Sequence, residues 1–354
     1  MQERVLMKGN EALAEAAIRA GCRHFFGYPI TPQTEINAYM ATNMPPRGGL
    51  YLQAESEIAA VNMLLGASAA GVRAMTSSSS PGISLKSEGI SYMAGSDLPG
   101  LIVNVQRAGP GLGGIQPAQG DYWQATKAPG HGDLHILVFA PSTVQEMVDL
   151  VFLAYDKSEE YRMPAMILAD GLMGQMMEAI QLPNYEYHPT EKPWATNGHQ
   201  NKREHNIINS LYIEAVNLEQ KLLERQKRYQ MIEEKEPLAE SYLTEDADIV
   251  LVAFGASARI ARSAVNSARK LGIKAGLVRP VTLWPFPQQA LRDAAKTAKQ
   301  MLVLEMNMGQ MVLDVRDAVR HAIPVEFFGK FGGIVPTPAE VLEQIQKQMG
   351  GTAQ

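Results

Sequence analysis

Cysteine is almost absent from this chain of 354 residues, in which Cys22 is the single thiol. One thiol cannot form an intrachain disulfide, and it cannot hold an iron–sulfur cluster, which needs several ligands. We therefore expect a cytoplasmic protein, and we expect any iron–sulfur cluster that it uses to belong to another chain. The 19 methionines are interpreted as flexible core residues and not as metal ligands.

Long apolar runs and an excess of basic residues are also lacking. No run of about 18 apolar residues occurs, so no membrane span is expected, and the N-terminus shows no signal-peptide pattern. The net charge of −5 argues against nucleic-acid binding as the main function. With 46% apolar and 19% charged residues, the composition is that of an ordinary soluble protein, long enough for two domains.

The order of strand-like and helical patterns predicts an α/β fold in three parts. Residues 1–180 alternate between apolar strands and helices, which predicts a parallel sheet with helices on both faces. Residues 181–245 begin with a loop and continue into a charged amphipathic pattern, which predicts a connector helix over 204–235. Residues 246–354 return to alternating strands and helices and predict a second α/β domain.

A turn near the N-terminus, Gly27-Tyr28-Pro29-Ile30-Thr31-Pro32, lies between a strand-like run and a helical pattern. A threonine before a proline is a common helix start, so Thr31 is expected to be the N-cap of the next helix. In α/β folds such a turn lies at the carboxyl ends of the strands, where ligands bind. The turn is therefore a candidate binding element.

An arginine stands at a similar position further along the chain. Arg107 follows the apolar strand 101–105, and a guanidinium placed there is suited to bidentate binding of a carboxylate. The glycine-rich run 109–114 is not interpreted as a dinucleotide-binding motif, because Pro110 within it and Pro117 after it leave no clean helix for a pyrophosphate. We expect these glycines to let the loop approach a substrate closely.

Two carboxylates and a serine run are further candidates. Glu55 and Glu57 stand at the start of the helical pattern 55–70, and position alone does not choose between them, although Glu55 better fits a plain charge in a first helical turn. Ser77 to Ser80 follow a predicted strand. They would either hydrogen-bond a ligand or cap the next helix, and capping is the commoner role.

The string from Tyr28 to Pro32, followed by Glu35, resembles the Tyr-Pro-Ile-Thr-Pro signature of the 2-oxoacid:ferredoxin oxidoreductases, which are thiamine-diphosphate enzymes. The resemblance extends over nearly the whole chain except the connector, and it is to the alpha-type subunit. It implies a pyrimidine-binding-type thiamine diphosphate domain over 1–180 and a transketolase C-terminal-like domain over 246–354. The implied reaction is the coenzyme-A-dependent oxidative decarboxylation of a 2-oxo acid to an acyl-CoA, with electrons passed to ferredoxin.

The resemblance also assigns roles to residues. It selects Glu57 over Glu55 as the carboxylate that holds the aminopyrimidine ring of the cofactor, and it implies that Gln119-Gly120-Asp121 fixes the glycine-rich loop. The implied catalytic residues are Glu57, Thr31 and Arg107, of which Thr31 and Arg107 orient the substrate. The implied cofactor-binding residues are Glu57, Tyr28, Pro29, Ile30 and Ser79.

One motif of thiamine enzymes is missing. They bind the diphosphate through a divalent cation held by a Gly-Asp-Gly motif, and the nearest fragment here is Asp170-Gly171. His131 and His135 are four residues apart, but the glycines beside His131 break any helix, so no metal site is expected in this chain. The resemblance therefore implies a hetero-oligomer. A beta-type subunit would carry the diphosphate site and Mg²⁺, with an iron–sulfur subunit or ferredoxin and a gamma-type subunit as further partners.

The substrate is predicted from the loop after Arg107. Members of the 2-oxoglutarate branch often have Arg-Gly-Gly-Pro-Ser-Thr-Gly, whereas this chain has Arg107-Ala108-Gly109-Pro110-Gly111-Leu112-Gly113. Two hydroxyls are thus replaced by an apolar neighbourhood, which favours a branched-chain acid such as 2-oxoisovalerate. The alternatives are a 2-oxoglutarate oxidoreductase subunit, a transketolase-like enzyme without electron transfer, and a noncatalytic assembly subunit.

Overall fold

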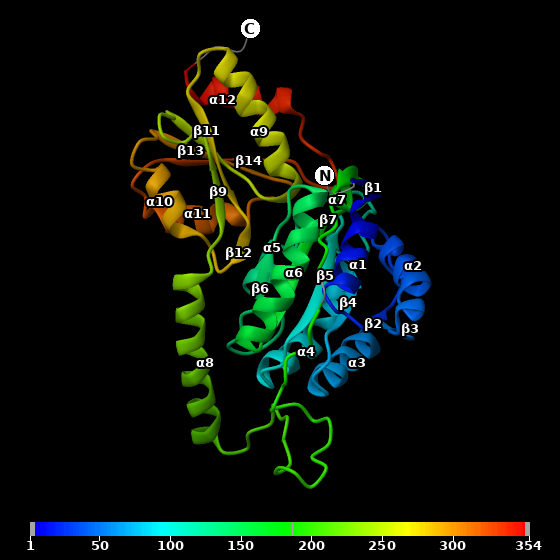
Figure 1. Ribbon diagram of the computed structural model, residues 1–354. Coiled ribbons are helices and arrows are strands. Elements are labelled where there is room, and N and C mark those ends of the chain that lie inside the picture. Colours follow the sequence, from blue (N-terminus) through cyan, green and yellow to red (C-terminus); the bar gives the residue numbers. More distant parts are fainter. Residues whose placement is uncertain (1–3, 186, 351–354) are drawn as a thin grey trace.

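The computed structural model describes residues 4–185 and 187–350, which form two α/β units side by side. Figure 1 shows one unit in blue, cyan and green beside a second unit in yellow, orange and red. Each unit contains a mainly parallel sheet with helices packed against it, so the predicted α/β class is confirmed. No helix of the described ranges combines the length and the hydropathy that a membrane crossing requires.

The first unit is organised around a seven-stranded sheet with the order β12-β6-β7-β5-β4-β2-β3. All neighbours pair in parallel except β12, which runs antiparallel to β6 and comes from the second half of the chain. Every residue of the central strands β5 and β7 is buried, so both faces of the sheet are covered and the strands are mostly apolar for that reason. The strands are β2 (His24–Gly27), β3 (Leu50–Gln53), β4 (Ala74–Ser78), β5 (Gly100–Gln106), β6 (Leu137–Phe139), β7 (Pro164–Asp170) and β12 (Thr282–Trp284).

Two helix pairs pack in this unit. Helices α3 and α4 contact each other and the strands β4 and β5, while α1 contacts α6 and α2. Helix α1 is rich in fully buried alanines, which allow this close approach. The helices are α1 (Gly9–Arg19), α2 (Thr34–Asn43), η1 (Pro45–Arg47), α3 (Glu57–Ala69), α4 (Ser80–Gly95), α5 (Tyr122–Thr126), α6 (Val144–Tyr161) and α7 (Gly171–Gln175). A small antiparallel pair, β1 (Val5–Lys8) and β8 (Met177–Ile180), completes the unit.

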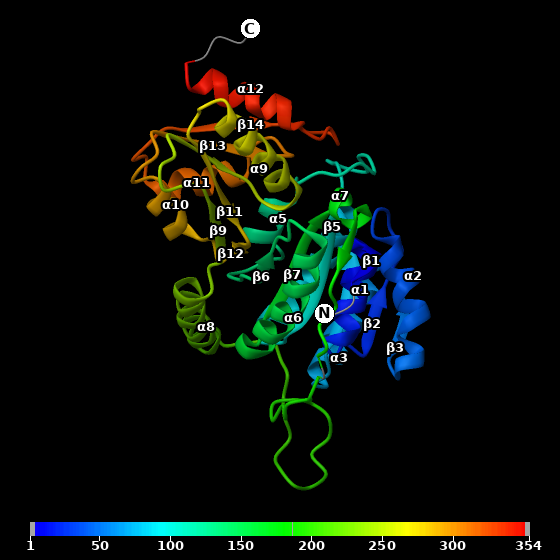
Figure 2. The ribbon, with the colours of Figure 1, turned by 45° about the horizontal axis from the view of Figure 1, so that its top comes forward.

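The second unit contains a five-stranded sheet with the order β14-β13-β10-β11-β9, in which the edge strand β9 is antiparallel. Helix α12 packs on α9, and α10 packs on α11; Figure 2 shows α12 at the outer end of this unit, in red. The strands are β9 (Ala239–Tyr242), β10 (Ile249–Val252), β11 (Ala275–Pro280), β13 (Gln300–Glu305) and β14 (Val325–Gly329). The helices are α9 (Gly255–Lys270), α10 (Gln288–Ala294), α11 (Met311–Val319) and α12 (Pro338–Gln348).

The connector differs from its prediction. The expected helix over 204–235 begins only at α8 (Ala215–Lys235), and the preceding segment forms a long loop that extends away from the first unit in Figures 1 and 2. Asparagine side chains explain the late start: the amide of Asn206 donates to the carbonyl of Ala195 at 2.9 Å, and that of Asn209 accepts from the backbone of Leu211. Such local bonds compete with helix formation. The prediction that Ile207 lies on a buried apolar face of this helix is also wrong, since its side chain is 84% exposed.

Candidate functional site

The carboxyl ends of β2, β4 and β5 meet at one edge of the seven-stranded sheet. The segments that leave these ends are the turn 28–33, the serine run 77–80 and the loop 107–121. Because parallel strands all end at the same edge, these three segments converge there. The residues predicted to act on the cofactor and the substrate therefore lie on neighbouring segments, with Glu57 at the start of α3.

The turn 28–33 does not cap α2 in the way that the sequence predicts. The N-cap position is occupied by Gln33, the helix begins at Thr34, and no side-chain cap bond is formed, so the assignment of Thr31 as N-cap is wrong. The Gln33 side chain instead fixes the turn: its amide donates to the carbonyl of Tyr28 at 3.1 Å, and its oxygen accepts from Ser77 at 2.6 Å. Thr31 is exposed, so its hydroxyl has no capping duty to share with a ligand.

Burial distinguishes the two candidate carboxylates. Ser56 is the N-cap of α3, with its hydroxyl accepting from the backbone of Ala59 at 3.2 Å, and Glu57 is the first helical residue. The sequence expectation that Glu55 better fits a charge in the first helical turn is therefore wrong. Glu57 occupies that turn and is 6% exposed, whereas Glu55 is exposed. The helix dipole favours a carboxylate at this point.

Gly82, in the first turn of α4, lies directly against the Glu57 carboxylate. A methyl group added at Gly82 would be 2.7 Å from Glu57 Oε1 and would overlap the hydroxyl of Ser78. Glu57 on α3, Gly82 on α4 and Ser78 on β4 thus meet within one small volume, which we call the Glu57 cradle. The absence of a side chain at position 82 gives Glu57 the room to lie in this cradle.

The serine run does not cap α4 through its side chains. Ser79 occupies the N-cap position without a side-chain cap bond, so the commoner role expected for it is wrong. The hydroxyls of Ser78 and Ser79 are buried and have no hydrogen-bond partner among the described residues. Since buried hydroxyls are normally satisfied, these two mark a place suited to a polar ligand.

Arg107 and Thr31 are brought together by the structure. The side chain of Arg107 is buried, and its Nη1 donates to the carbonyl of Thr31 at 3.1 Å while Nη2 donates to the carbonyl of Leu112 at 3.1 Å. Its Nε is buried and has no partner in the described part of the chain. A guanidinium has five N–H donors, so Arg107 ties two loops together and retains donors for a carboxylate.

The loop 107–121 is fixed by the second unit as well as by the first. The Gln119 side chain accepts from the hydroxyl of Ser257 at 2.7 Å and from the backbone of Met306 at 3.1 Å, and it donates to the carbonyl of Phe254 at 2.9 Å. Sequence reasoning expected a local loop anchor at 119–121. It missed that the partners lie more than 130 residues away in the chain.

Asp121 holds the loop from the other side. Its carboxylate accepts from the hydroxyl of Ser80 at 2.6 Å and from the amide of Asn104 at 2.9 Å. Burial raises the pKa of Asp121, and the two hydrogen bonds oppose that rise. Asp121 therefore connects the carboxyl end of β5, the start of α4 and the loop.

A cavity of about 690 Å³ opens between this loop and the second unit. Its wall includes Ser80 and Asp121 from the first unit, together with Asn307 and Phe331 from the second. The cavity is large enough for a substrate-sized molecule. It adjoins the loop that Arg107 holds, so a molecule bound in it would lie beside the candidate site.

Asp170, the nearest fragment of a diphosphate-binding motif, has a structural role. Its carboxylate accepts from the backbone of Leu172 and of Met173, both at 3.0 Å, and thereby caps α7. Complete burial raises the pKa of Asp170 to about 6, against the effect of these bonds. The described residues contain no group of three or more His, Cys, Asp and Glu side chains arranged for a metal ion.

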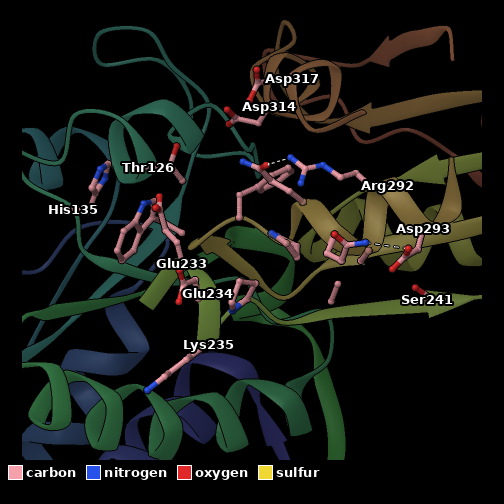
Figure 3. A pocket seen from close by; sticks show the side chains of 18 of the residues that line it. Thr126, His135, Glu233, Glu234, Lys235, Ser241, Arg292, Asp293, Asp314 and Asp317 are labelled. Atoms are coloured by element: carbon pink, nitrogen blue, oxygen red, sulfur yellow. Dashed lines mark hydrogen bonds between the residues drawn. The ribbon is translucent and has the colours of Figure 1, made fainter. Parts of the chain in front are cut away.

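A second cavity, of about 830 Å³, lies between the end of α8 and the helices α10 and α11 (Figure 3). None of the predicted site residues lines it. Two of its cations are engaged, because Lys127 pairs with Asp314 at 2.6 Å and Arg292 donates to the carbonyl of Ala318 at 2.9 Å, and Lys235 is a further cation in its wall. The predicted site residues therefore lie at the sheet edge and not in this cavity.

The fold is that of an α/β protein whose candidate ligand-binding segments lie at the carboxyl ends of parallel strands. Residues 15–244 match the family model described as pyruvate flavodoxin/ferredoxin oxidoreductase, thiamine diphosphate-binding, and residues 247–341 match pyruvate:ferredoxin oxidoreductase core domain II. The chain belongs to the 2-oxoacid:ferredoxin oxidoreductase family, as the resemblance in its sequence predicted.

Individual relatives agree with this assignment. The chain is 45% identical to ketoisovalerate oxidoreductase subunit VorB of Methanothermobacter thermautotrophicus, over 98% of this chain and 99% of the relative. It is 37% identical to 2-oxoglutarate synthase subunit KorA of the same organism, again over 98% and 99%.

Solved structures show the same fold. The 2-oxoglutarate:ferredoxin oxidoreductase from Magnetococcus marinus, solved with 2-oxoglutarate, coenzyme A and succinyl-CoA bound, matches with a TM-score of 0.87 and 26% identity. The match covers 98% of this chain and 66% of that longer chain. A split-gene transketolase, described as an inactive beta4 tetramer, matches with a TM-score of 0.58 and 14% identity over 97% and 98% of the chains, which indicates the fold alone.

Proposed function

We propose that this chain is the alpha-type subunit of an enzyme that oxidatively decarboxylates a 2-oxo acid to an acyl-CoA and passes the electrons to ferredoxin. The observation that carries the proposal is the cradle of Glu57, where a buried carboxylate and partnerless hydroxyls converge at the sheet edge of a chain with this family membership. The proposal keeps the three parts of the sequence prediction: 1–180 for the cofactor, 181–245 as connector and 246–354 as second domain.

The residues at this edge fit the aminopyrimidine half of thiamine diphosphate. Glu57 would accept a hydrogen bond from the ring, and Ser79 would satisfy its buried hydroxyl on a polar atom of the cofactor. The turn of Tyr28, Pro29 and Ile30 lies at the same edge and would contribute backbone and apolar contacts. When bound, thiamine diphosphate supplies the nucleophilic carbon and takes up the charge that develops as carbon dioxide leaves.

Arg107 and Thr31 would bind the substrate. The free donors of Arg107 would hold the planar carboxylate of the 2-oxo acid, and the exposed Thr31 hydroxyl would donate to it. Because Arg107 also donates to the Thr31 carbonyl, the guanidinium and the Thr31 hydroxyl keep a fixed position relative to each other. Their shared position orients the acid before the reaction and excludes free rotation of its carboxylate.

The remaining parts of the reaction are assigned to partners. A beta-type subunit would carry the diphosphate and Mg²⁺, since Asp170 is committed to capping α7. Iron–sulfur clusters would lie on a further subunit or on ferredoxin because this chain has one buried cysteine, and a gamma-type subunit would complete the assembly. The exposed apolar residues Leu112, Met308 and Phe331 near the 690 Å³ cavity suit such an interface. A cytoplasmic location is part of the same proposal.

The proposed substrate is a branched-chain acid, 2-oxoisovalerate. Higher identity to the ketoisovalerate relative (45%) than to the 2-oxoglutarate relative (37%) supports it, together with the apolar Gly111-Leu112 segment beside Arg107. An apolar pocket separates substrates by only about 1–3 kcal/mol per methylene. Related 2-oxo acids are therefore expected to react as well.

The test is viologen reduction by the co-purified complex, with and without coenzyme A, on 2-oxoisovalerate, 2-oxoglutarate and pyruvate. The expected result is coenzyme-A-dependent reduction that is fastest with 2-oxoisovalerate. Fastest reduction with 2-oxoglutarate would establish the alternative substrate. Absence of reduction in a complex that retains thiamine diphosphate and iron would overturn the proposed activity, and turnover in a complex free of iron would indicate a transketolase-like enzyme.

A further inference from the structure

A lysine lies in the tight contact between α3 and α4. Lys86 is 0% exposed and stands on α4 one helical turn after Gly82. A methyl group at Gly82 would press on Glu57, and one at Gly89 would overlap the side chain of Val61. The face of α4 that carries these glycines therefore lies directly on α3, and Lys86 stands between the two points of closest approach.

The ammonium of Lys86 is directed to the N-terminal turn of α3. Its Nζ donates to the hydroxyl of Thr76 at 3.0 Å and approaches the backbone carbonyl of Glu57 at 3.4 Å. A lysine is almost never fully buried unless a charge pairs with it, because burying an unpaired ammonium is very costly. Burial lowers the pKa of Lys86 to about 8, and the charge of Glu57 opposes this decrease.

The elements around Lys86, as far as the structure describes them, offer no charge besides Glu57 that would explain a buried cation at this point. Strand β4 contributes the neutral Thr76, and α3 contributes Glu57. On α4 itself, Glu88 is exposed and accepts from the hydroxyl of Tyr92. Within residues 4–185 and 187–350, Glu57 is thus the charged residue of a neighbouring element that acts on Lys86, and an uncharged side chain of similar length would fill the same space without the cost of burial.

We propose that Lys86 is a positioning residue for Glu57. Its ammonium ties the first turn of α3 to β4 through the Glu57 carbonyl and the Thr76 hydroxyl, and so places the Glu57 carboxylate where it can accept a hydrogen bond from the cofactor. This role of Lys86 rests on the proposed function, because it concerns the cofactor that Glu57 is proposed to bind. It adds a group that the sequence did not single out and that does not itself touch cofactor or substrate.

The test measures thiamine diphosphate affinity of the co-purified complex by calorimetry between pH 5.5 and 9.5, for the wild type and Lys86→Met. Methionine matches the length of lysine without its charge. Without the ammonium the first turn of α3 loses its hydrogen bonds to Lys86, so the variant should bind the cofactor about tenfold more weakly near pH 7. The wild type should also lose affinity above about pH 8, and the variant should lack this alkaline limb.

Lys192→Met is the matched control. Lys192 is also nearly buried and pairs with Glu159, but it lies beside Gly71, after the end of α3 opposite to Glu57, so its loss should leave the cofactor affinity and its pH dependence unchanged. In a Glu57→Gln background, Lys86→Met should have a smaller effect on affinity than in the wild type, because the carboxylate that this turn positions has been removed.

Each outcome has a distinct meaning. Identical pH profiles for the wild type and Lys86→Met, in a complex that binds thiamine diphosphate, would overturn the role of Lys86 and leave the proposed function standing. Absence of thiamine diphosphate binding by the wild-type complex would instead overturn the proposed function. If Lys86→Met fails to assemble, the loss of cofactor affinity above about pH 8 can be compared between the wild type and Glu57→Gln. Persistence of this alkaline loss in Glu57→Gln would contradict the link between Lys86 and Glu57, and its absence there would support that link.

Discussion

Replacing Gly82 by alanine should damage cofactor binding far more than it damages the fold. The added methyl would be 2.7 Å from Glu57 Oε1 and would overlap the hydroxyl of Ser78, so the ends of two side chains must move. Overpacking of this kind costs about 1–3 kcal/mol, and the better helix propensity of alanine returns about 1 kcal/mol. We expect a net loss of about 1 kcal/mol in stability. The displaced Glu57 carboxylate should reduce thiamine diphosphate affinity at least about tenfold, which is about 1.4 kcal/mol.

Gly66→Ala is the matched control, because a methyl group at Gly66 on α3 meets nothing within 4 Å. This variant should be about 1 kcal/mol more stable than the wild type and bind the cofactor normally. Thermal unfolding of the chain and calorimetric titration of the complex with thiamine diphosphate measure both effects. Wild-type cofactor affinity in Gly82→Ala would refute the placement of the cofactor against the Glu57 cradle.

Three further changes test other parts of the structure. Arg107→Lys removes the forked guanidinium that holds two loops and is proposed to bind the substrate carboxylate, so the KM for the 2-oxo acid should rise at least about tenfold. An unchanged KM would exclude Arg107 from substrate binding. Loss of turnover only through loss of assembly would indicate a scaffold role. Gln119→Ala leaves three groups of the second unit without their partner and should cost about 2–4 kcal/mol, seen as a lower melting temperature; an unchanged value would contradict the inter-unit link. The pKa of Lys86 is about 8 in the folded chain and has an ordinary value of 10.5, so between these two pH values the unfolded chain binds more protons than the folded chain. The free energy of unfolding of the wild type should therefore rise with pH across this window by about 3 kcal/mol relative to that of Lys86→Met. Parallel curves of stability against pH for the two proteins would refute this.

The sequence was sufficient for the fold class and for the segments that form the candidate site. Mostly apolar runs such as 101–105 predict buried parallel strands, and an arginine directly after one predicts a group at the edge of the sheet where ligands bind in such folds. The structure brings Arg107 and Thr31 together there. These features are local in the sequence, which is why residue patterns reveal them.

Long-range contacts explain what the sequence could not reveal. Thr31 was expected to cap α2, but the Gln33 side chain, bonded to Ser77 on β4, sets the turn instead. Gln119 finds its partners in the second unit, and nothing in its own neighbourhood indicates them. Lys86 would be read as a surface lysine, and the only local signal for its burial is the pair of glycines that flank it on one helix face.

The measurement that tests the central claim most directly is thiamine diphosphate binding and 2-oxo-acid turnover by three complexes: wild type, Glu57→Gln and Glu55→Gln. The two variants make the same chemical change two residues apart, one on the buried and one on the exposed carboxylate. We predict loss of turnover by at least about a hundredfold and weakened binding in Glu57→Gln, because the amide cannot hold the proton that the carboxylate shares with the cofactor. Glu55→Gln should match the wild type. Full activity in Glu57→Gln, or equal losses in both variants, would contradict the account.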